Sequence, residues 1–185
     1  MLRKVIEVKL INSKDFAVIS YIKFAIVLFA LVVSSQIKLY IPFTPVPITA
    51  QTLAVIIGSA WIGNMLAPLA VIVYIALGLI GLPVFAGGGG IYKLIGPTGG
   101  YLLGFVIASW IISKVINKRY SWSLILGVFS IGSILILLLG TIFLSYYLGI
   151  SFFHSLNLGF LPFLPGELLK VAVAAGVYKM IIAKY

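Results

Sequence analysis

The sequence predicts an all-α, polytopic membrane protein. Hydrophobic residues make up 63% of the 185 residues and charged residues only 9%, whereas soluble domains carry about 25% charged residues. Apolar stretches alternate with proline- or glycine-rich connections, and a membrane-spanning helix needs about 20 apolar residues. We predict one membrane domain over residues 1–185 with six transmembrane helices, at approximately 16–38, 49–67, 68–81, 97–117, 122–147 and 165–183. The substrate site is expected to be formed by the extracellular loops and helix ends.

The N-terminal stretch, residues 1–15, is predicted to be a cytoplasmic tail. It mixes basic and apolar residues at irregular spacing, and the first apolar run begins only after Asp15. A cleaved signal peptide has its apolar core directly after the charges and a small-residue cleavage site behind it, so we do not expect a signal peptide here. In the helix that follows, Ala30 and Ser34 are four residues apart, a spacing of small residues suited to close helix packing.

The connection between the first two helices is rich in proline. Pro42, Pro45 and Pro47 lie within six residues, and each removes a backbone donor and restricts the residue before it. We therefore expect a rigid, extended connection. Gln51 follows in the first turn of the next helix. It either hydrogen-bonds locally or reaches a ligand, and the sequence leaves both options open.

A glycine-rich stretch from Gly78 to Gly104 holds ten of the nineteen glycines. A flexible linker is usually polar, but this stretch carries Phe85 and Tyr92, so we interpret it as a folded, functional loop. It lacks the P-loop pattern and the dinucleotide-binding pattern, because Pro97 and Lys93 stand where those motifs need other residues.

Basic residues indicate the orientation. Cytoplasmic loops of membrane proteins carry an excess of lysine and arginine. Lys38 and Lys93 fall on the side of the proline- and glycine-rich loops, and nine basic residues fall on the side of both termini: Arg3, Lys4, Lys9, Lys14, Lys114, Lys118, Arg119, Lys179 and Lys184. The prediction is a multi-pass plasma-membrane protein with both termini cytoplasmic. The net charge of +10 is too scattered along the chain to indicate nucleic-acid binding.

Glu167 and Lys170 form the strongest candidate site. They are three residues apart and so share one helix face, and Glu167 is the only acidic residue after Asp15. Ionisable residues within membrane helices are costly and are candidates for function; the alternative is a structural ion pair near the interface. One histidine and no cysteine leave no metal-ligand cluster and no catalytic set. We therefore expect no enzyme activity, metal or cofactor.

Four motifs carry a resemblance to a known family: TPVPITAQT (44–52), GLPVFAGG (81–88), GPTGGYLLGF (96–105) and PFLPGELLK (162–170). Together they resemble the BioY family, the biotin-specific substrate-binding components of energy-coupling factor transporters. The resemblance implies a six-helix domain that binds biotin from outside and works with a transmembrane coupling protein and two cytoplasmic ATPases. It also implies that the Ala30–Ser34 pair docks on the coupling protein. The chain departs from the family in Glu167, where aspartate is more usual, and in Ser34, where the usual pattern has alanine.

The chemistry of biotin fits the charged residues. Biotin has a ureido head, an apolar ring and a carboxylate tail. Glu167 is expected to accept hydrogen bonds from the ureido nitrogens, Lys170 to donate to the ureido oxygen, and Lys93 to bind the carboxylate, although the opposite orientation stays open. The remaining candidate binding residues are Phe43, Gln51, Phe85, Gly87, Gly88 and Tyr92. A stand-alone secondary transporter is the alternative function, but it would have Glu167 as its single embedded acid for ion coupling.

Overall fold

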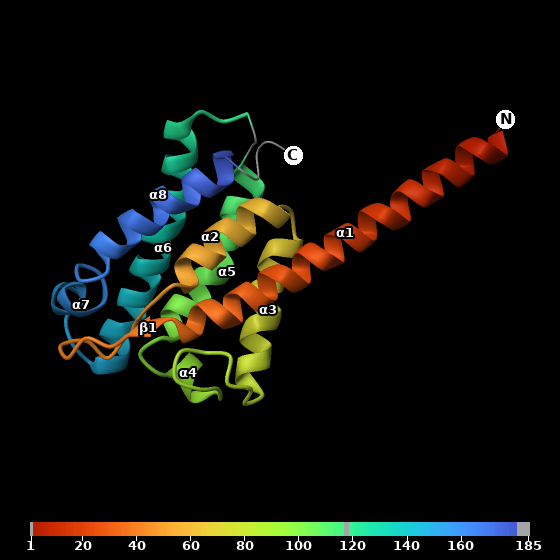
Figure 1. Cartoon of the computed structure of the whole chain (residues 1–185). Coiled ribbons are helices and arrows are strands. Elements are labelled where there is room, and N and C mark those ends of the chain that lie inside the picture. Colours follow the sequence, from red (N-terminus) through yellow and green to blue (C-terminus); the bar gives the residue numbers. More distant parts are fainter. Residues whose placement is uncertain (1, 117–118, 181–185) are drawn as a thin grey trace.

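The structure, a computed structural model, describes residues 2–116 and 119–180, and their side chains from residue 17 onward. The fold is mostly helical, as predicted. Its helices are α1 (Leu2–Gln36), α2 (Gln51–Ile62), α3 (Leu66–Leu79), α4 (Tyr92–Ile95), α5 (Gly99–Val115), α6 (Trp122–Leu148), α7 (Phe152–Gly159) and α8 (Leu164–Met180) (Figure 1). Strands β1 (Lys38–Leu39) and β2 (Ile48–Thr49) pair antiparallel, so the proline-rich connection is a small hairpin.

Helix α1 differs from its predicted bounds at both ends. The chain is helical from Leu2, so the stretch 2–15 continues the helix instead of forming a separate tail. No glycine or proline occurs between residues 2 and 36, and these are the residues that most often end a helix. At the other end α1 stops at Gln36 because Lys38 pairs with Thr49 in the hairpin. The N-terminal half of α1 projects away from the other helices (Figure 1).

Helix lengths do not confirm six membrane spans. Residues Ala17–Gln36 and Trp122–Leu148 are long and apolar enough to cross a membrane, and α7 with α8 forms a third candidate, bent by 57°. Helices α2, α3 and α5 have only 12, 14 and 17 residues. The second helix ends at Ile62 rather than at the predicted residue 67, because Gly63 and Asn64 have φ angles of 67° and 53°. The predicted helix ends at residues 117 and 183, with Lys118 and Lys184, lie outside the described residues.

The predicted helix bounds leave residues 148–164 as a loop, and this is wrong for part of that segment. Residues Phe152–Gly159 form α7. Ser151 caps this helix by accepting a hydrogen bond of 3.2 Å from the backbone N–H of His154, a standard role for serine. His154 itself is exposed.

A strip of small residues on α5 is a packing surface for α6. Gly100, Gly104 and Ala108 are buried. A Cβ atom on Gly104 would lie 2.9 Å from the Cα of Ile136 on α6, so the two helices pack backbone to backbone, as small residues allow.

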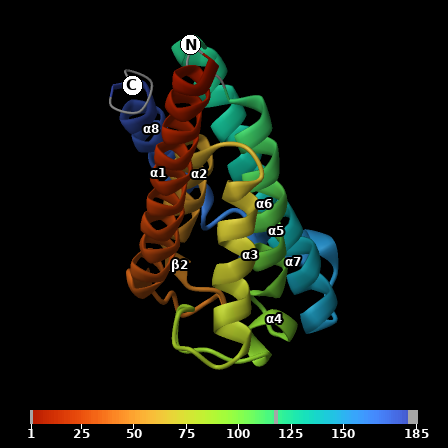
Figure 2. The ribbon, with the colours of Figure 1, turned by 90° about the vertical axis from the view of Figure 1, so that its right-hand side faces the viewer.

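Loops gather at one end of the helical bundle. The hairpin, α4 and α7 lie at this end, whereas the C-terminal ends of α5 and α8 and the start of α6 lie at the opposite end (Figures 1 and 2). The arrangement brings the proline-rich and glycine-rich segments together, although about 40 residues separate them in the sequence.

Candidate functional site

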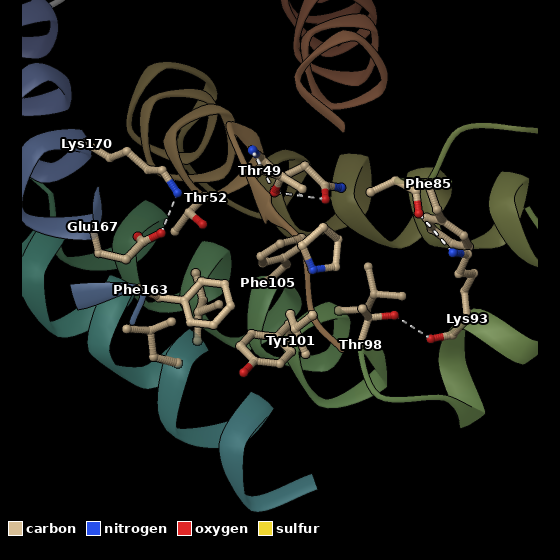
Figure 3. Close-up of a pocket in the computed structure, with 17 residues that line it drawn as sticks. Thr49, Thr52, Phe85, Lys93, Thr98, Tyr101, Phe105, Phe163, Glu167 and Lys170 are labelled. Carbon is tan, nitrogen blue, oxygen red and sulfur yellow. Dashed lines mark hydrogen bonds and ion pairs between the residues drawn. The ribbon is translucent and has the colours of Figure 1, made fainter. Parts of the chain in front are cut away.

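A cavity of about 50 Å³ lies at the loop end of the bundle. The hairpin, the glycine-rich loop and helices α2, α5, α6 and α8 enclose it (Figure 3). The lining residues are Val46, Pro47, Thr49, Gln51, Thr52, Phe85, Ala86, Lys93, Thr98, Tyr101, Leu102, Phe105, Ile136, Leu137, Phe163, Glu167 and Lys170.

A buried ion pair forms one end of the cavity. Lys170 donates from Nζ to Glu167 Oε1 at 2.6 Å, and Ser133 on α6 donates from Oγ to Glu167 Oε2, also at 2.6 Å. Glu167 is 4% exposed and lies in the first turn of α8, where the helix dipole favours a negative charge. A carboxylate has about four lone-pair sites, so Glu167 keeps capacity to accept further hydrogen bonds.

Lys93 lies at the other end of the cavity, in α4. Its Nζ donates to the carbonyl oxygen of Ala86 at 2.9 Å, and the hydroxyl of Thr98 donates to the Lys93 carbonyl at 3.0 Å. Partial burial, and secondarily the positive charge of Lys38, lower the pKa of Lys93 below its usual 10.5. An anion beside Lys93 would offset both effects.

The wall between the two charged ends is mainly aromatic. Tyr101, Phe105 and Phe163 lie between Lys93 and the Glu167–Lys170 pair (Figure 3). Their ring surfaces offer contact to an apolar ligand, since ligand sites are typically apolar with a few placed polar groups. The cavity is therefore charged at both ends and mainly aromatic between them, with Thr49 as a polar residue in the same stretch (Figure 3).

The glycine-rich loop is folded, as predicted. Phe85 and Gly88 exchange two backbone hydrogen bonds, of 3.0 and 3.2 Å, and Gly87 and Gly88 have φ angles of 84° and 118°, which glycine adopts without strain. Phe85 is 3% exposed and rests directly against Gly78, where any Cβ atom would overlap its ring. The loop thereby holds the Phe85 ring in the cavity wall.

Gln51 makes the local hydrogen bond that the sequence left open, and its contact with a ligand stays a prediction. It accepts a local hydrogen bond from Thr49 Oγ1 at 3.2 Å, and it also lines the cavity. Its Nε2 donates to Tyr74 Oη at 2.5 Å, and Tyr74 donates to the carbonyl oxygen of Val84 at 2.9 Å. Ser35 on α1 donates to the same carbonyl at 2.6 Å. These bonds fix the backbone next to Phe85 to α1, α2 and α3.

The structure brings together five of the nine predicted binding residues: Gln51, Phe85, Lys93, Glu167 and Lys170. The other four, Phe43, Gly87, Gly88 and Tyr92, do not line this cavity. Phe43 and Tyr92 are 58% and 54% exposed, although Lys93 Nζ lies 5.4 Å from the centre of the Tyr92 ring.

Sequence reasoning missed several residues of the site. Four of them line the cavity: Thr52, Tyr101, Phe105 and Phe163. A fifth, Ser133, does not line the cavity but donates a hydrogen bond to Glu167. The first four lie within the quoted family motifs, and their place in those motifs was the sequence feature that could have identified them. Ser133 lies in none of them, and its role depends on how α6 packs on α8.

The predicted docking pair lies on a face of α1 that is partly covered by the chain itself. Ser34 is 8% exposed, and its hydroxyl donates to the carbonyl oxygen of Leu31 at 3.0 Å. Ala30 is half-buried. Its docking role stays a prediction.

Comparison with known proteins decides the family. A family model described as the BioY family matches residues 8–185. The chain belongs to the BioY family. The resemblance predicted from the four motifs is thus confirmed, and this BioY-family chain is a membrane protein of a transporter family.

Curated relatives and a solved structure agree with this assignment. The Biotin transporter BioY of Thermotoga maritima is 39% identical over 138 residues, which cover 73% of this chain and 80% of the relative. The Probable biotin transporter BioY of Pyrococcus horikoshii is 36% identical, with 80% and 88% covered. The crystal structure of an S-component for biotin from an ECF-type ABC transporter superposes with a TM-score of 0.80 at 26% identity, with 92% of this chain and 96% of that chain covered.

Proposed function

We propose that this BioY-family protein captures biotin in the cavity, as the substrate-binding component of an energy-coupling factor importer. The observation that carries the proposal is the cavity's distribution of polarity. Lys93 lies at one end, the Glu167–Lys170 pair at the other, and aromatic side chains lie between them. Biotin has the same order of groups, and the names of the relatives and of the matching S-component support the ligand.

The ureido head binds at the Glu167–Lys170 end. Glu167 accepts from the ureido N–H groups while Ser133 and Lys170 hold its two oxygens, and Lys170 has two further donors for the ureido oxygen. Hydrogen bonds to charged groups contribute about 1.5–3 kcal/mol each. The carboxylate tail binds Lys93, and the ring packs against Phe163 and Tyr101.

Biotin entry requires the cavity to open. Ligand pockets usually enclose about 300–1,000 Å³, and the present cavity has about 50 Å³. Val46 and Pro47 in the hairpin, with Ala86 and Lys93 in the glycine-rich loop, form walls that lie outside the long helices. These two segments move apart when biotin binds, and the Lys93–Ala86 hydrogen bond exchanges for one to the ligand.

The membrane arrangement follows from the charge distribution. Six helices, α1, α2, α3, α5, α6 and α8, cross the plasma membrane with both termini cytoplasmic and the loop end outside, since basic residues are nine to two in favour of the terminal side. A transmembrane coupling protein and two cytoplasmic ATPases complete the importer, so the energy for uptake comes from partners.

The test is biotin binding to the purified chain in detergent, measured by isothermal titration calorimetry without any partner. We expect tight binding of one biotin per chain, and no biotin uptake by the chain alone in proteoliposomes under a proton or sodium gradient. Desthiobiotin keeps the ureido head but lacks the thiophane ring, and free lipoic acid lacks the ureido head; both serve as specificity controls. A well-folded chain that does not bind biotin contradicts the proposal, and gradient-driven uptake supports the secondary transporter instead.

A further inference from the structure

A second concave surface lies between α3 and α5, in the half of the bundle opposite the biotin cavity. It is an open groove of about 570 Å³, lined by apolar side chains that include Leu69, Ile72, Ile107 and Trp110. These four side chains are each between 43% and 48% exposed. Figure 2 shows α3 and α5 side by side along this face. The groove is separate from the cavity in its residues and its chemistry.

A cation lies at one end of this groove. Lys114 is one helical turn after Trp110 on α5, so the two side chains share a face. Its Nζ lies 4.3 Å from the centre of the Trp110 ring, and its side chain is exposed. A tryptophan with a neighbouring lysine is typical of the level at which lipid headgroups meet the hydrocarbon core.

Helix length places the groove at the depth of lipid chains. Helix α3 has 14 residues, which at 1.5 Å per residue give about 21 Å, less than the hydrocarbon thickness of about 30 Å. A short helix makes the bilayer thin locally or draws headgroups inward. The apolar groove beside α3 is then covered by lipid chains, with headgroups close to Lys114.

We propose that the α3–α5 groove binds one anionic phospholipid, with an acyl chain along Leu69, Ile72 and Ile107 and the phosphate group at Lys114. Charge complementarity favours this occupant. An apolar protein helix would cover the groove but would leave Lys114 without a negative partner, and a zwitterionic lipid would present a balanced headgroup. A negatively charged amphiphile matches both the apolar groove and the cation at its end.

Tryptophan fluorescence tests the proposal directly, because Trp110 lines the groove. The chain has three tryptophans, and replacing Trp61 and Trp122 by phenylalanine leaves Trp110 as the only tryptophan, which is excited selectively over tyrosine. The chain is reconstituted in phosphatidylcholine bilayers that contain either dibrominated phosphatidylglycerol or dibrominated phosphatidylcholine, which carry the same quenching chains. We expect the anionic lipid to associate about fivefold more strongly, equal to about 1 kcal/mol per lysine at a charged surface.

The variant Lys114→Gln should abolish this preference, whereas Lys23→Gln should keep it. Lys23 is a matched control because it also lies over a tryptophan, 5.6 Å from the Trp61 ring centre, but away from the groove. Native mass spectrometry of the chain with all three tryptophans, with and without Lys114→Gln, gives the same comparison if the single-tryptophan variant does not fold. Equal quenching by both lipids, or a preference that survives Lys114→Gln, overturns the proposal. Disulfide formation between two Leu69→Cys chains in bilayers also overturns it, because a second copy would then occupy the groove.

Discussion

The substitution Lys170→Ala separates a binding role of the buried ion pair from a purely structural one. Lys170 Nζ lies 2.6 Å from Glu167 Oε1, and the two side chains are 15% and 5% exposed. Truncating Lys170 leaves Ser133 as the donor to Glu167 within the described part of the chain. Removing one member of a desolvated charged pair costs about 2–5 kcal/mol in binding, so we expect biotin affinity to fall by roughly 30-fold to several thousand-fold.

The assay is biotin titration calorimetry on each purified variant, with its melting temperature measured in parallel. Lys93→Ala should weaken binding less than Lys170→Ala, because Lys93 is bonded to the carbonyl oxygen of Ala86 and its loss leaves no buried charge unpaired. Lys38→Ala is the control for a cation that acts on Lys93 only through its charge and lines no wall of the cavity. Its lysine is exposed in β1, outside the cavity, so its affinity should stay close to that of the unmodified chain.

A double variant, Glu167→Gln with Lys170→Met, completes the test. Removing one charge of a buried pair is destabilising, but replacing both charges is often neutral. If the pair contacts biotin, the double variant should regain melting temperature while its affinity stays low. Normal affinity in a well-folded Lys170→Ala or in the double variant would refute our assignment and make the pair a structural one.

Three further predictions follow from the same contacts. Because burial lowers the pKa of Lys93 below 10.5, this lysine loses its proton at a lower pH than usual. The affinity for biotin should therefore fall as the pH rises toward 10.5, whereas the affinity for biotin amide should stay level. Parallel pH trends for the two ligands would contradict the role of Lys93. Ser133→Ala leaves Glu167 Oε2 without its donor and should cost about 1–3 kcal/mol of stability, and an unchanged melting temperature would argue against that bond. In this cysteine-free chain, Ile91→Cys should react with an impermeant thiol reagent from outside, and Ser123→Cys should react only after permeabilisation. The reverse labelling pattern would contradict the proposed orientation of the termini.

Helix positions were largely predictable because long uncharged apolar runs have few alternatives in a membrane chain. Their ends were not. Helix α2 stops where Gly63 and Asn64 take positive φ angles, and α1 extends through the charged residues 2–15 because no residue there breaks it. Local backbone conformation decides such boundaries, and hydrophobicity alone does not specify it.

The charged part of the site was predictable for an energetic reason. Glu167, Lys170 and Lys93 stand out because charges are rare and costly near membrane helices. Aromatic residues were harder to assign. Phe43 and Tyr92 lie in the unusual loops but are exposed and do not line the cavity, as is common for aromatics near a membrane surface. Tyr101 and Phe163 line the cavity because α5, α6 and α8 pack around it, which sequence spacing does not reveal.

A structure of the chain with biotin bound tests the central claim most directly. We predict biotin between the two charged ends of an enlarged cavity, with its ureido group on Glu167 and Lys170, its ring against Phe163 and Tyr101, and its carboxylate on Lys93. Biotin bound elsewhere on the protein, with the Glu167–Lys170 pair unchanged and the cavity still near 50 Å³, would contradict the account.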